Sequence, residues 1–323
     1  MVQWRTLVAG AMMAGSLVME STLAMAGENA EQWVQKMLSA ARQTSYQGHS
    51  VMLSGGQITS MAIYHAPFDN EVWERVVHLS GEPAEILRKG STITCLHPDS
   101  TSRIDLQSTP MGKLTALEES AQSISRYYRF DQAGNERVAG REGVRINVEP
   151  LDSNRYGYSL WLDEDTGVLL KSQTNPDSGD PLEVFEFVSL EIGAPLTREA
   201  FQPAAGLQAA TLSAPASKES AATTETWVAE WLPDGFRPVG PAASSAGRPG
   251  VSSRVFTDGL AAFTVFFEPK GSTTIESSRA RGATVAVNRL LPESSAQVTV
   301  VGEIPLATAS KVAEHVKALA ANP

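Results

Sequence analysis

The chain has 323 residues, which is enough for two domains of ordinary size. Hydrophobic residues make up 42% of it and charged residues 19%, so it can bury real cores and is not wholly disordered. The 36 acidic residues outnumber the 26 basic ones, the net charge is -10, and no basic run interrupts the sequence, which argues against nucleic acid as a partner. The single cysteine, Cys95, excludes an intramolecular disulfide framework, a cysteine-rich zinc site and an iron–sulfur cluster.

The N-terminal segment has the pattern of a signal peptide. Arg5 precedes an almost continuous apolar stretch, Leu7–Met19, and Ala24-Met25-Ala26 then matches a cleavage site. The apolar stretch is too short to span a bilayer, and Glu20 ends it. We therefore expect residues 1–26 to be a signal peptide that is cleaved after Ala26, and the mature chain to be exported.

The mature chain is predicted to begin with an amphipathic helix over residues 29–43, with Trp33 as its largest apolar side chain and Asn29 and Gln32 as a capping box. From Tyr46 the hydrophobic period becomes two, which is typical of strands. The predicted strands are Gln47–Leu53, Gln57–His65, Val72–Leu79, Ala84–Lys89, Ser91–Leu96, Arg141–Glu149, Tyr156–Leu162, Val168–Thr174 and Leu182–Ile192, with a helical interval over Leu114–Tyr128.

Short turns join these strands, and short connections require antiparallel pairing. About ten such strands with a few helices predict one large, curved sheet over residues 27–202, with helices on one face and a possible ligand cavity beneath them. Residues 203–224 are rich in Ala, Ser and Thr and are expected to form a linker.

Residues 225–323 are predicted to form a small α+β domain. Two hairpins, Ser252–Phe256 with Leu260–Glu268 and Thr284–Leu291 with Gln297–Glu303, predict a sheet of four or five antiparallel strands. A helix is expected to follow, with Pro305 at its first position. Its apolar face would consist of Leu306, Ala309, Val312, Ala313, Val316 and Leu319.

The motifs of common catalytic sites are absent from the sequence. It contains no G-x-S-x-G, no H-E-x-x-H and no glycine-rich phosphate loop, and its five histidines are isolated from one another. Asp163–Gly167 resembles the start of a calcium loop, but Thr174 stands where such a loop needs a bidentate glutamate. We therefore expect no enzymatic activity, no cofactor and no metal site.

Five segments, in order, carry a family resemblance: Ser45–Gly48, Arg155–Ser172, Glu230–Phe236, Thr257–Pro269 and Val298–Ala309. Each alone is mostly strand and turn chemistry. Together they resemble the MucB/RseB family of periplasmic negative regulators of an envelope-stress sigma factor, most closely its MucB branch.

The resemblance implies an α+β, mostly antiparallel protein with two domains. The large domain would be a half-open β-barrel with packed helices, similar to the lipoprotein carriers LolA and LolB, and the small α+β domain would follow it. The family binds the periplasmic part of a single-pass membrane anti-sigma factor, MucA or RseA, and shields it from the site-1 protease. Lipid or lipopolysaccharide relieves the shielding. The sequence does not determine the oligomeric state, so a homo-oligomer stays open.

A LolA-like periplasmic carrier of lipoproteins or lipids is the alternative function. A carrier needs only the curved-sheet domain, so the second domain argues against it. An exported hydrolase is the third hypothesis, and no set of catalytic residues in the sequence supports it.

Alternation along the strands gives candidate residues for contact with a lipid and for contact with the protein partner. A lipid cavity would be lined by Val51 and Leu53, or by Met61 and Ile63, or by Tyr158, Leu160 and Leu162, although any of these can simply fill a core. Phe266 lies on the opposite face of its strand from Phe263 and is a candidate partner contact, or it packs against the large domain. The remaining candidates are Trp231 and Arg237 for the partner, and Arg126, Arg129, Arg137, Arg141 and Arg145 for a lipopolysaccharide.

Overall fold

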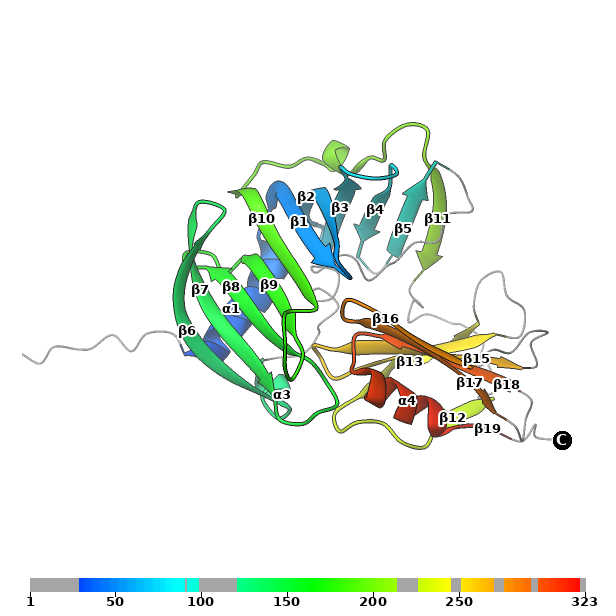
Figure 1. The fold of residues 1–323 in the computed structure, drawn as a ribbon. Coiled ribbons are helices and arrows are strands. Elements are labelled where there is room, and N and C mark those ends of the chain that lie inside the picture. Colours follow the sequence, from blue (N-terminus) through cyan, green and yellow to red (C-terminus); the bar gives the residue numbers. More distant parts are fainter. Residues whose placement is uncertain are drawn as a thin grey trace, which may run out of the picture.

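Figure 1 shows the computed structural model of the chain, in which two sheets each carry a helix on one face. The structure describes residues 29–90, 92–98, 121–213, 226–244, 251–269, 276–291 and 296–319. The expected signal peptide and the first part of the helical interval 114–128 lie outside these residues. In the part of the chain that is described, no helix is both long and apolar enough to cross a membrane.

Helix α1 (Ala30–Gln43) forms as its sequence predicts. The Asn29 side chain accepts a hydrogen bond from the Gln32 amide at 2.9 Å, and the Gln32 side chain accepts one from the Asn29 amide at 2.8 Å. This capping box satisfies amides that the first helical turn leaves free. The apolar side of α1, including Trp33, is buried against the large sheet.

The large sheet has eleven described strands, all antiparallel, in the order β11-β5-β4-β3-β2-β1-β10-β9-β8-β7-β6. Their bounds are β1 (Tyr46–Ser54), β2 (Gln57–Phe68), β3 (Glu71–His78), β4 (Glu85–Lys89), β5 (Thr92–His97), β6 (Tyr128–Val138), β7 (Arg141–Pro150), β8 (Gly157–Asp163), β9 (Leu169–Asn175), β10 (Glu183–Ile192) and β11 (Gln208–Ser213).

Nine of these strands were predicted from the sequence, and two were not. β6 was missed because it is an edge strand whose residues between Tyr128 and Val138 are almost all exposed, so no alternation marks it. β11 lies inside the stretch 203–224 that we expected to be a linker, yet it pairs with β5 along its whole length. The sheet therefore extends past residue 202, after the short helix η2 (Arg198–Phe201).

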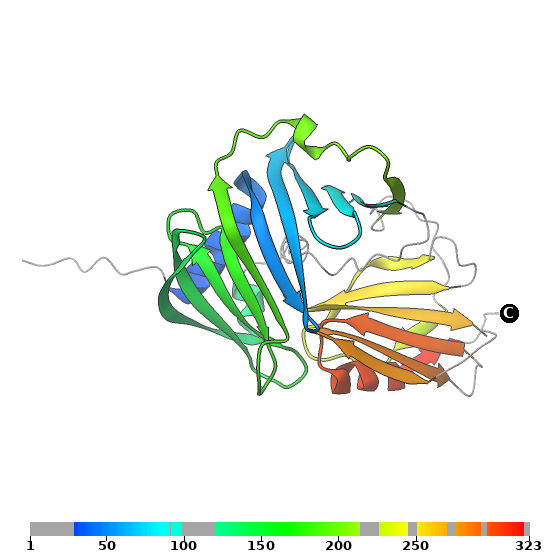
Figure 2. The ribbon, with the colours of Figure 1, turned by 45° about the horizontal axis from the view of Figure 1, so that its top comes forward.

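The sheet is curved but not closed, because β6 and β11 stand at opposite ends of the strand order. Figures 1 and 2 show α1 lying on its concave side. The short helix α3 (Ala121–Ile124) also packs there, since Ile124 belongs to the same buried core as α1. The expected class is confirmed: a mostly antiparallel α+β fold with a half-open barrel and a small second domain.

The small domain contains a six-stranded sheet in the order β13-β14-β15-β18-β17-β16, with helix α4 (Leu306–Glu314) on one face. The strands are β13 (Arg237–Ser244), β14 (Ser252–Thr257), β15 (Ala262–Pro269), β16 (Ser277–Arg281), β17 (Thr284–Leu291) and β18 (Ala296–Gly302). A separate two-stranded ribbon joins β12 (Trp227–Ala229) to β19 (Val316–Ala318).

Three details of this domain differ from the expectation. The sheet gains its two edge strands, β13 and β16, whose polar or proline-containing sequences hide the strand pattern. Pro305 is the N-cap of α4 rather than its first helical residue. The helix also ends at Glu314, so Val316 keeps its buried position but reaches it from strand β19.

The two faces of β2 should respond differently to the same truncation. Ile63 is 2% exposed in the core beneath α1, whereas Ile58 is 70% exposed on the other face. We expect Ile63→Ala to lower the free energy of unfolding by about 2–5 kcal/mol and the matched control Ile58→Ala to change it by at most about 0.5 kcal/mol. Urea unfolding of both variants checks this, and equal losses would contradict the assignment of the faces.

Candidate functional site

The two domains meet at a buried ion pair. Arg155, in the loop between β7 and β8, is fully buried, and its Nη1 lies 2.6 Å from Oδ2 of Asp258 in the turn between β14 and β15. Its Nη2 also donates to the backbone carbonyl of Asp234 at 2.7 Å. One side chain of the large domain thus binds two separate turns of the small domain.

Neighbouring groups hold this ion pair in position. Asp152 accepts from Nε and Nη2 of Arg155 at 3.0 and 2.8 Å, which fixes the plane of the guanidinium. The Oδ1 atom of Asp258 accepts from the amide of Ala261 at 2.8 Å, and Tyr128 donates its hydroxyl to Oδ2 at 2.9 Å. Burial and the nearby Asp258 raise the pKa of Tyr128 well above its usual value, so the hydroxyl keeps the proton that it donates.

Aromatic rings complete the junction. The Arg155 guanidinium carbon lies 5.1 Å from the ring centre of Tyr127, 5.5 Å from that of Tyr128 and 5.2 Å from that of Phe236. These distances are typical of cation–π contacts. Gly235, at φ +85°, lies against the Tyr127 ring so closely that any Cβ would collide with it. The turn before Phe236 therefore needs glycine for both its conformation and its contact.

A second contact joins the β1–β2 turn to the β16–β17 turn. Glu183 accepts from the Ser54 hydroxyl at 2.9 Å and from the Ala283 amide at 3.3 Å through the same oxygen. Arg281 donates to Gln57 beside it. Figure 2 shows these two turns meeting at one end of the small sheet. With two separate contacts, the orientation of the domains is defined.

The junction accounts for three of the five segments that carry the family resemblance. Arg155–Ser172 supplies the arginine, Glu230–Phe236 supplies the glycine turn, and Thr257–Pro269 supplies the aspartate. From the sequence alone, each of these segments is typical of a strand and its turn. Their common function at one interface could not be found from the sequence, because Arg155 and Asp258 are 103 residues apart.

Removing the charge at the junction should uncouple the domains. We expect Asp258→Asn to cost about 3–5 kcal/mol, because it leaves the buried guanidinium of Arg155 with only the partly exposed Asp152 as its counter-ion. Arg289→Gln, which breaks an exposed pair with Glu314 on the small domain, should cost about 1 kcal/mol or less. Thermal unfolding measures the loss, and small-angle scattering should show a larger radius of gyration for Asp258→Asn only. Scattering and stability like those of the wild type would contradict this role.

The three candidate partner residues do not form one patch. Phe266 is half-buried on the sheet face away from α4, since Phe263 and Phe267 fill the face beneath the helix. Trp231 packs on the α4 side, with Lys311 Nζ 4.0 Å from its ring centre. Arg237 is exposed at the start of β13.

The candidate lipid-lining residues also divide between two faces. Met61, Ile63, Leu160 and Leu162 lie together in the core beneath α1, and Tyr158 packs against that core. Val51 is half-buried and Leu53 is 39% exposed on the opposite face, as alternation along β1 requires. Only the first group can border a space between the sheet and α1.

A row of polar side chains crosses the concave face beside this core. Tyr46, His65, Glu74 and Arg88 are cross-strand neighbours on β1, β2, β3 and β4. Tyr46 stacks on His65 with ring centres 4.5 Å apart, and His65 Nε2 donates to the Ala41 carbonyl of α1 at 3.0 Å. Each of the four side chains keeps one buried polar atom without a hydrogen-bond partner in the described structure. This row cannot be predicted from the sequence, because its four residues lie on four different strands.

The titration of Glu74 should make stability depend on pH. Burial raises its pKa from 4.5 to about 7, with Arg88 opposing. A carboxyl with a raised pKa contributes its full stability below pH 4.5 and loses that contribution as the pH rises to about 7, here about 3 kcal/mol. We therefore expect the free energy of unfolding of Glu74→Gln, relative to that of the wild type, to rise by about this much between pH 5 and pH 8. Urea unfolding measures it. Parallel pH profiles for the two proteins would contradict it.

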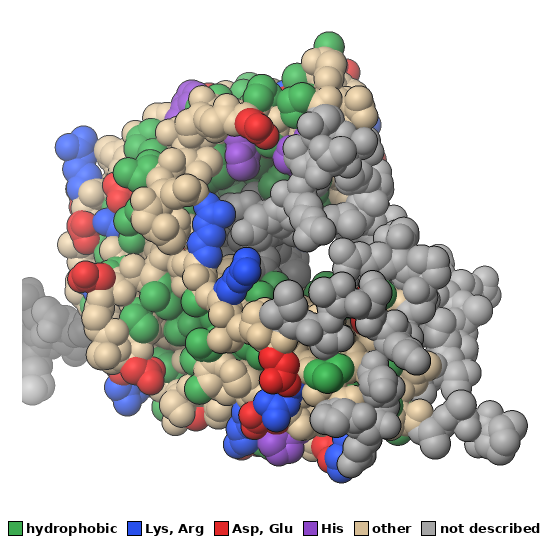
Figure 3. Space-filling view, turned by 45° about the vertical axis from the view of Figure 1, so that its right-hand side comes forward, with side chains coloured by type: hydrophobic (Ala, Val, Ile, Leu, Met, Phe, Trp, Pro, Cys, Tyr) green, Lys and Arg blue, Asp and Glu red, His purple; other side chains and the backbone are tan. Residues whose placement is uncertain are grey.

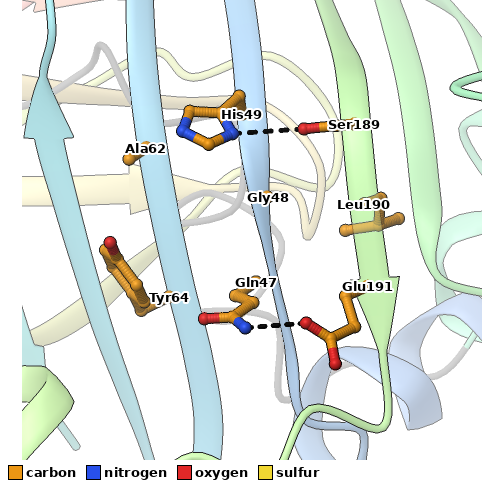
Figure 4. A pocket seen from close by; sticks show the side chains of 8 residues that line it. All are labelled: Gln47, Gly48, His49, Ala62, Tyr64, Ser189, Leu190 and Glu191. Carbon is orange, nitrogen blue, oxygen red and sulfur yellow. Dashed lines mark hydrogen bonds between the residues drawn. The ribbon is translucent and has the colours of Figure 1, made fainter.

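The outer face of the large sheet carries a shallow groove of about 410 Å³ across β1, β2 and β10. Figure 4 shows that its polar side chains already bind one another: Gln47 donates to Glu191 at 2.7 Å, and His49 and Ser189 are hydrogen-bonded at 3.1 Å. None of the predicted contact residues lines this groove.

Charges on the described surface are mixed. Figure 3 shows basic and acidic side chains interspersed with hydrophobic ones on the face in view. Three of the arginines proposed for lipopolysaccharide are already engaged: Arg129 with Asp131 and Glu149, Arg141 with Asp163, and Arg145 over the Trp161 ring. Within the described ranges, no group of three or more His, Cys, Asp or Glu residues is placed to hold a metal ion.

Comparison with known proteins gives matches along nearly the whole chain. The family model described as the MucB/RseB N-terminal domain matches residues 29–205, and that of the MucB/RseB C-terminal domain matches residues 221–317. The chain is 34% identical over 307 residues to the sigma factor AlgU regulatory protein MucB of Pseudomonas aeruginosa, covering 91% of this chain and 92% of the relative. It is 26% identical to the sigma-E factor regulatory protein RseB of Escherichia coli, covering 88% and 89%.

Solved structures also match along nearly the whole chain. The complex of Pseudomonas aeruginosa MucA and MucB matches with a TM-score of 0.72 and 33% identity, covering 90% of this chain and 99% of the matched one. A structure of MucB with the periplasmic part of MucA matches with a TM-score of 0.70 and 32% identity, covering 91% and 100%.

Proposed function

The chain belongs to the MucB/RseB family, whose named members are sigma factor regulatory proteins rather than enzymes, and we propose that it binds the periplasmic part of a MucA/RseA-like membrane anti-sigma factor. The observation that carries this proposal is the match over both domains to MucB as it occurs in its complex with MucA. The proposal includes export to the periplasm, with cleavage of the signal peptide after Ala26.

The domain junction supports partner binding because it holds the small domain in one orientation. Association costs less free energy when the binding surface is already in place. The buried pair of Arg155 and Asp258 fixes the relative orientation of the domains before any partner arrives. We propose that the partner contacts the small domain at Phe266 and extends to Trp231 or Arg237, which requires it to pass around an edge of the sheet.

Shielding from site-1 proteolysis and release by lipid form the finer part of the proposal. A lipid can weaken partner binding only if it prefers the partner-free state of the protein. The apolar side chains beneath α1, including Met61, Ile63 and Leu160, are the proposed contacts for its acyl chains. Because they now pack as a core, acyl chains must displace some of these contacts, and that displacement would couple lipid binding to the shape of the large domain.

Calorimetric titration tests the proposal as a whole. Residues 27–323 are titrated with the periplasmic segment of the anti-sigma factor from the same organism, with and without a lipid A analogue. We expect binding that the lipid weakens by about tenfold, a coupling free energy of about 1.4 kcal/mol. Absence of binding at micromolar concentrations would reject the regulatory role and favour the LolA-like carrier, which retrieval of lipoproteins from membranes would then test.

Truncation of Phe266 should locate the partner surface. We expect Phe266→Ala to weaken anti-sigma binding by about tenfold or more, as for a central aromatic contact. Leu306→Ala is the matched control, because Leu306 is an exposed apolar residue on α4, on the other side of the domain. Equal affinities for Phe266→Ala and the wild type would remove Phe266 from the interface.

A further inference from the structure

The polar row on the concave face needs an explanation that the proposed function does not supply. Tyr46 and His65 are fully buried, and Glu74 is 3% exposed. A buried polar atom without a hydrogen bond destabilises a fold, because it loses its bond to water and gains none in return. Four such atoms in one cross-strand row point to a group that they bind together.

The hydrogen-bonding state of His65 can be deduced from its neighbours. Its Nε2 must be the donor to the Ala41 carbonyl, because a carbonyl oxygen only accepts. Burial lowers the pKa of His65 to about 4, so the ring is neutral near pH 7 and its Nδ1 is an acceptor. Oε2 of Glu74 lies 3.9 Å from this Nδ1. Two acceptors therefore face each other while Glu74 is ionised.

A proton on Glu74 changes this balance. The protonated carboxyl is a donor, and a small movement from 3.9 Å brings it within hydrogen-bonding distance of His65 Nδ1. The free atoms that then remain are the Tyr46 hydroxyl and Nη1 of Arg88. Both are donors, and Arg88 carries the only full charge of the row. A row with surplus donors and an unbalanced positive charge suits an anion.

The adjacent row of the same face is entirely apolar. Its buried cross-strand neighbours on β2, β3, β4 and β5 are Ile63, Val76, Ile86 and Cys95. A ligand that reaches the polar row therefore also lies against hydrocarbon. A free inorganic anion would gain nothing from these side chains, whereas an acyl chain would.

We propose that Tyr46, His65, Glu74 and Arg88 form a proton-linked binding site for the acidic head of an amphiphile, a carboxylate or phosphate carried on an acyl chain. Arg88 and Tyr46 donate to the anion, and Glu74 takes up one proton and donates to His65. The free atoms are closed to solvent, so the site opens before it binds. The site rests on the proposed function, because it lies in the domain to which that proposal assigns the response to lipid.

The groups that act on Glu74 in the described structure are few. Arg88 faces it from β4, His65 from β2, and Tyr46 lies beyond His65 on β1. From α1, the contact with the row is the Ala41 carbonyl, which does not titrate. Proton uptake on binding near pH 8 can therefore be assigned to Glu74.

Calorimetry of mature protein at pH 8, in two buffers of different ionisation enthalpy, tests the site. The probes are laurate, dodecyl phosphate, dodecanol and inorganic phosphate. We expect the two anionic amphiphiles to bind with uptake of about one proton, and dodecanol and inorganic phosphate to bind at least tenfold more weakly. Comparison of laurate with dodecyl phosphate shows whether the site prefers a carboxylate or a phosphate head group. Equal binding of dodecanol would show that the site recognises only the chain and would overturn the proposal.

Two variants separate recognition from folding. Glu74→Gln should bind the anionic amphiphiles without proton uptake, because the amide donates to His65 without titrating. Arg88→Gln should weaken them by about tenfold or more, whereas Arg289→Gln, which changes an exposed arginine on β17 of the small domain, should not. Circular dichroism confirms that each variant is folded. Proton uptake that persists in Glu74→Gln, or unchanged affinity in Arg88→Gln, would overturn the site.

The same proteins are also titrated with the anti-sigma segment. Anti-sigma binding without any binding of anionic amphiphiles would overturn the site and leave the proposed function intact. Amphiphile binding without anti-sigma binding would overturn the proposed function and leave the site intact.

Discussion

The arrangement of the two domains depends on one buried charge pair. Arg155 and Asp258 are both inaccessible to solvent. Without Arg155 the Asp258 carboxylate would be a costly isolated charge, and without Asp258 the guanidinium would keep only the partly exposed Asp152. The surrounding aspartate, tyrosines and glycine turn all serve to hold that pair in place. The shape of any surface that spans both domains therefore depends on this pair.

The sequence predicted most of the fold because local patterns determine most of its elements. The capping box at Asn29, the glycine turn after Ser54 and the alternation along β15 each depend on residues that are close in sequence. The edge strands β6, β11, β13 and β16 were not predicted, because polar, small or proline residues interrupt the alternation in their sequences. Long-range pairing leaves no periodic signal in the strand itself.

The functional residues could be predicted less well than the fold. Alternation identified pairs such as Val51 with Leu53 and Met61 with Ile63, but it could not decide which pair faces α1. The polar row depends on the register of β1 to β4, which places Tyr46 beside His65 although 19 positions separate them. The residues that flank a position in the sequence do not show which residues lie beside it across the sheet.

The open edge between β6 and β11 has a mechanical consequence. In a closed barrel, the number of strands and their stagger fix the radius, so the interior cannot expand without breaking hydrogen bonds. Among the described strands, β6 and β11 are the two edges of the large sheet and do not pair with each other. Small changes of twist, shared among its strands, can widen or narrow the space above the concave face while every described ladder stays paired. For the proposed lipid response, this freedom would let the domain take up acyl chains of different size without any loss of secondary structure.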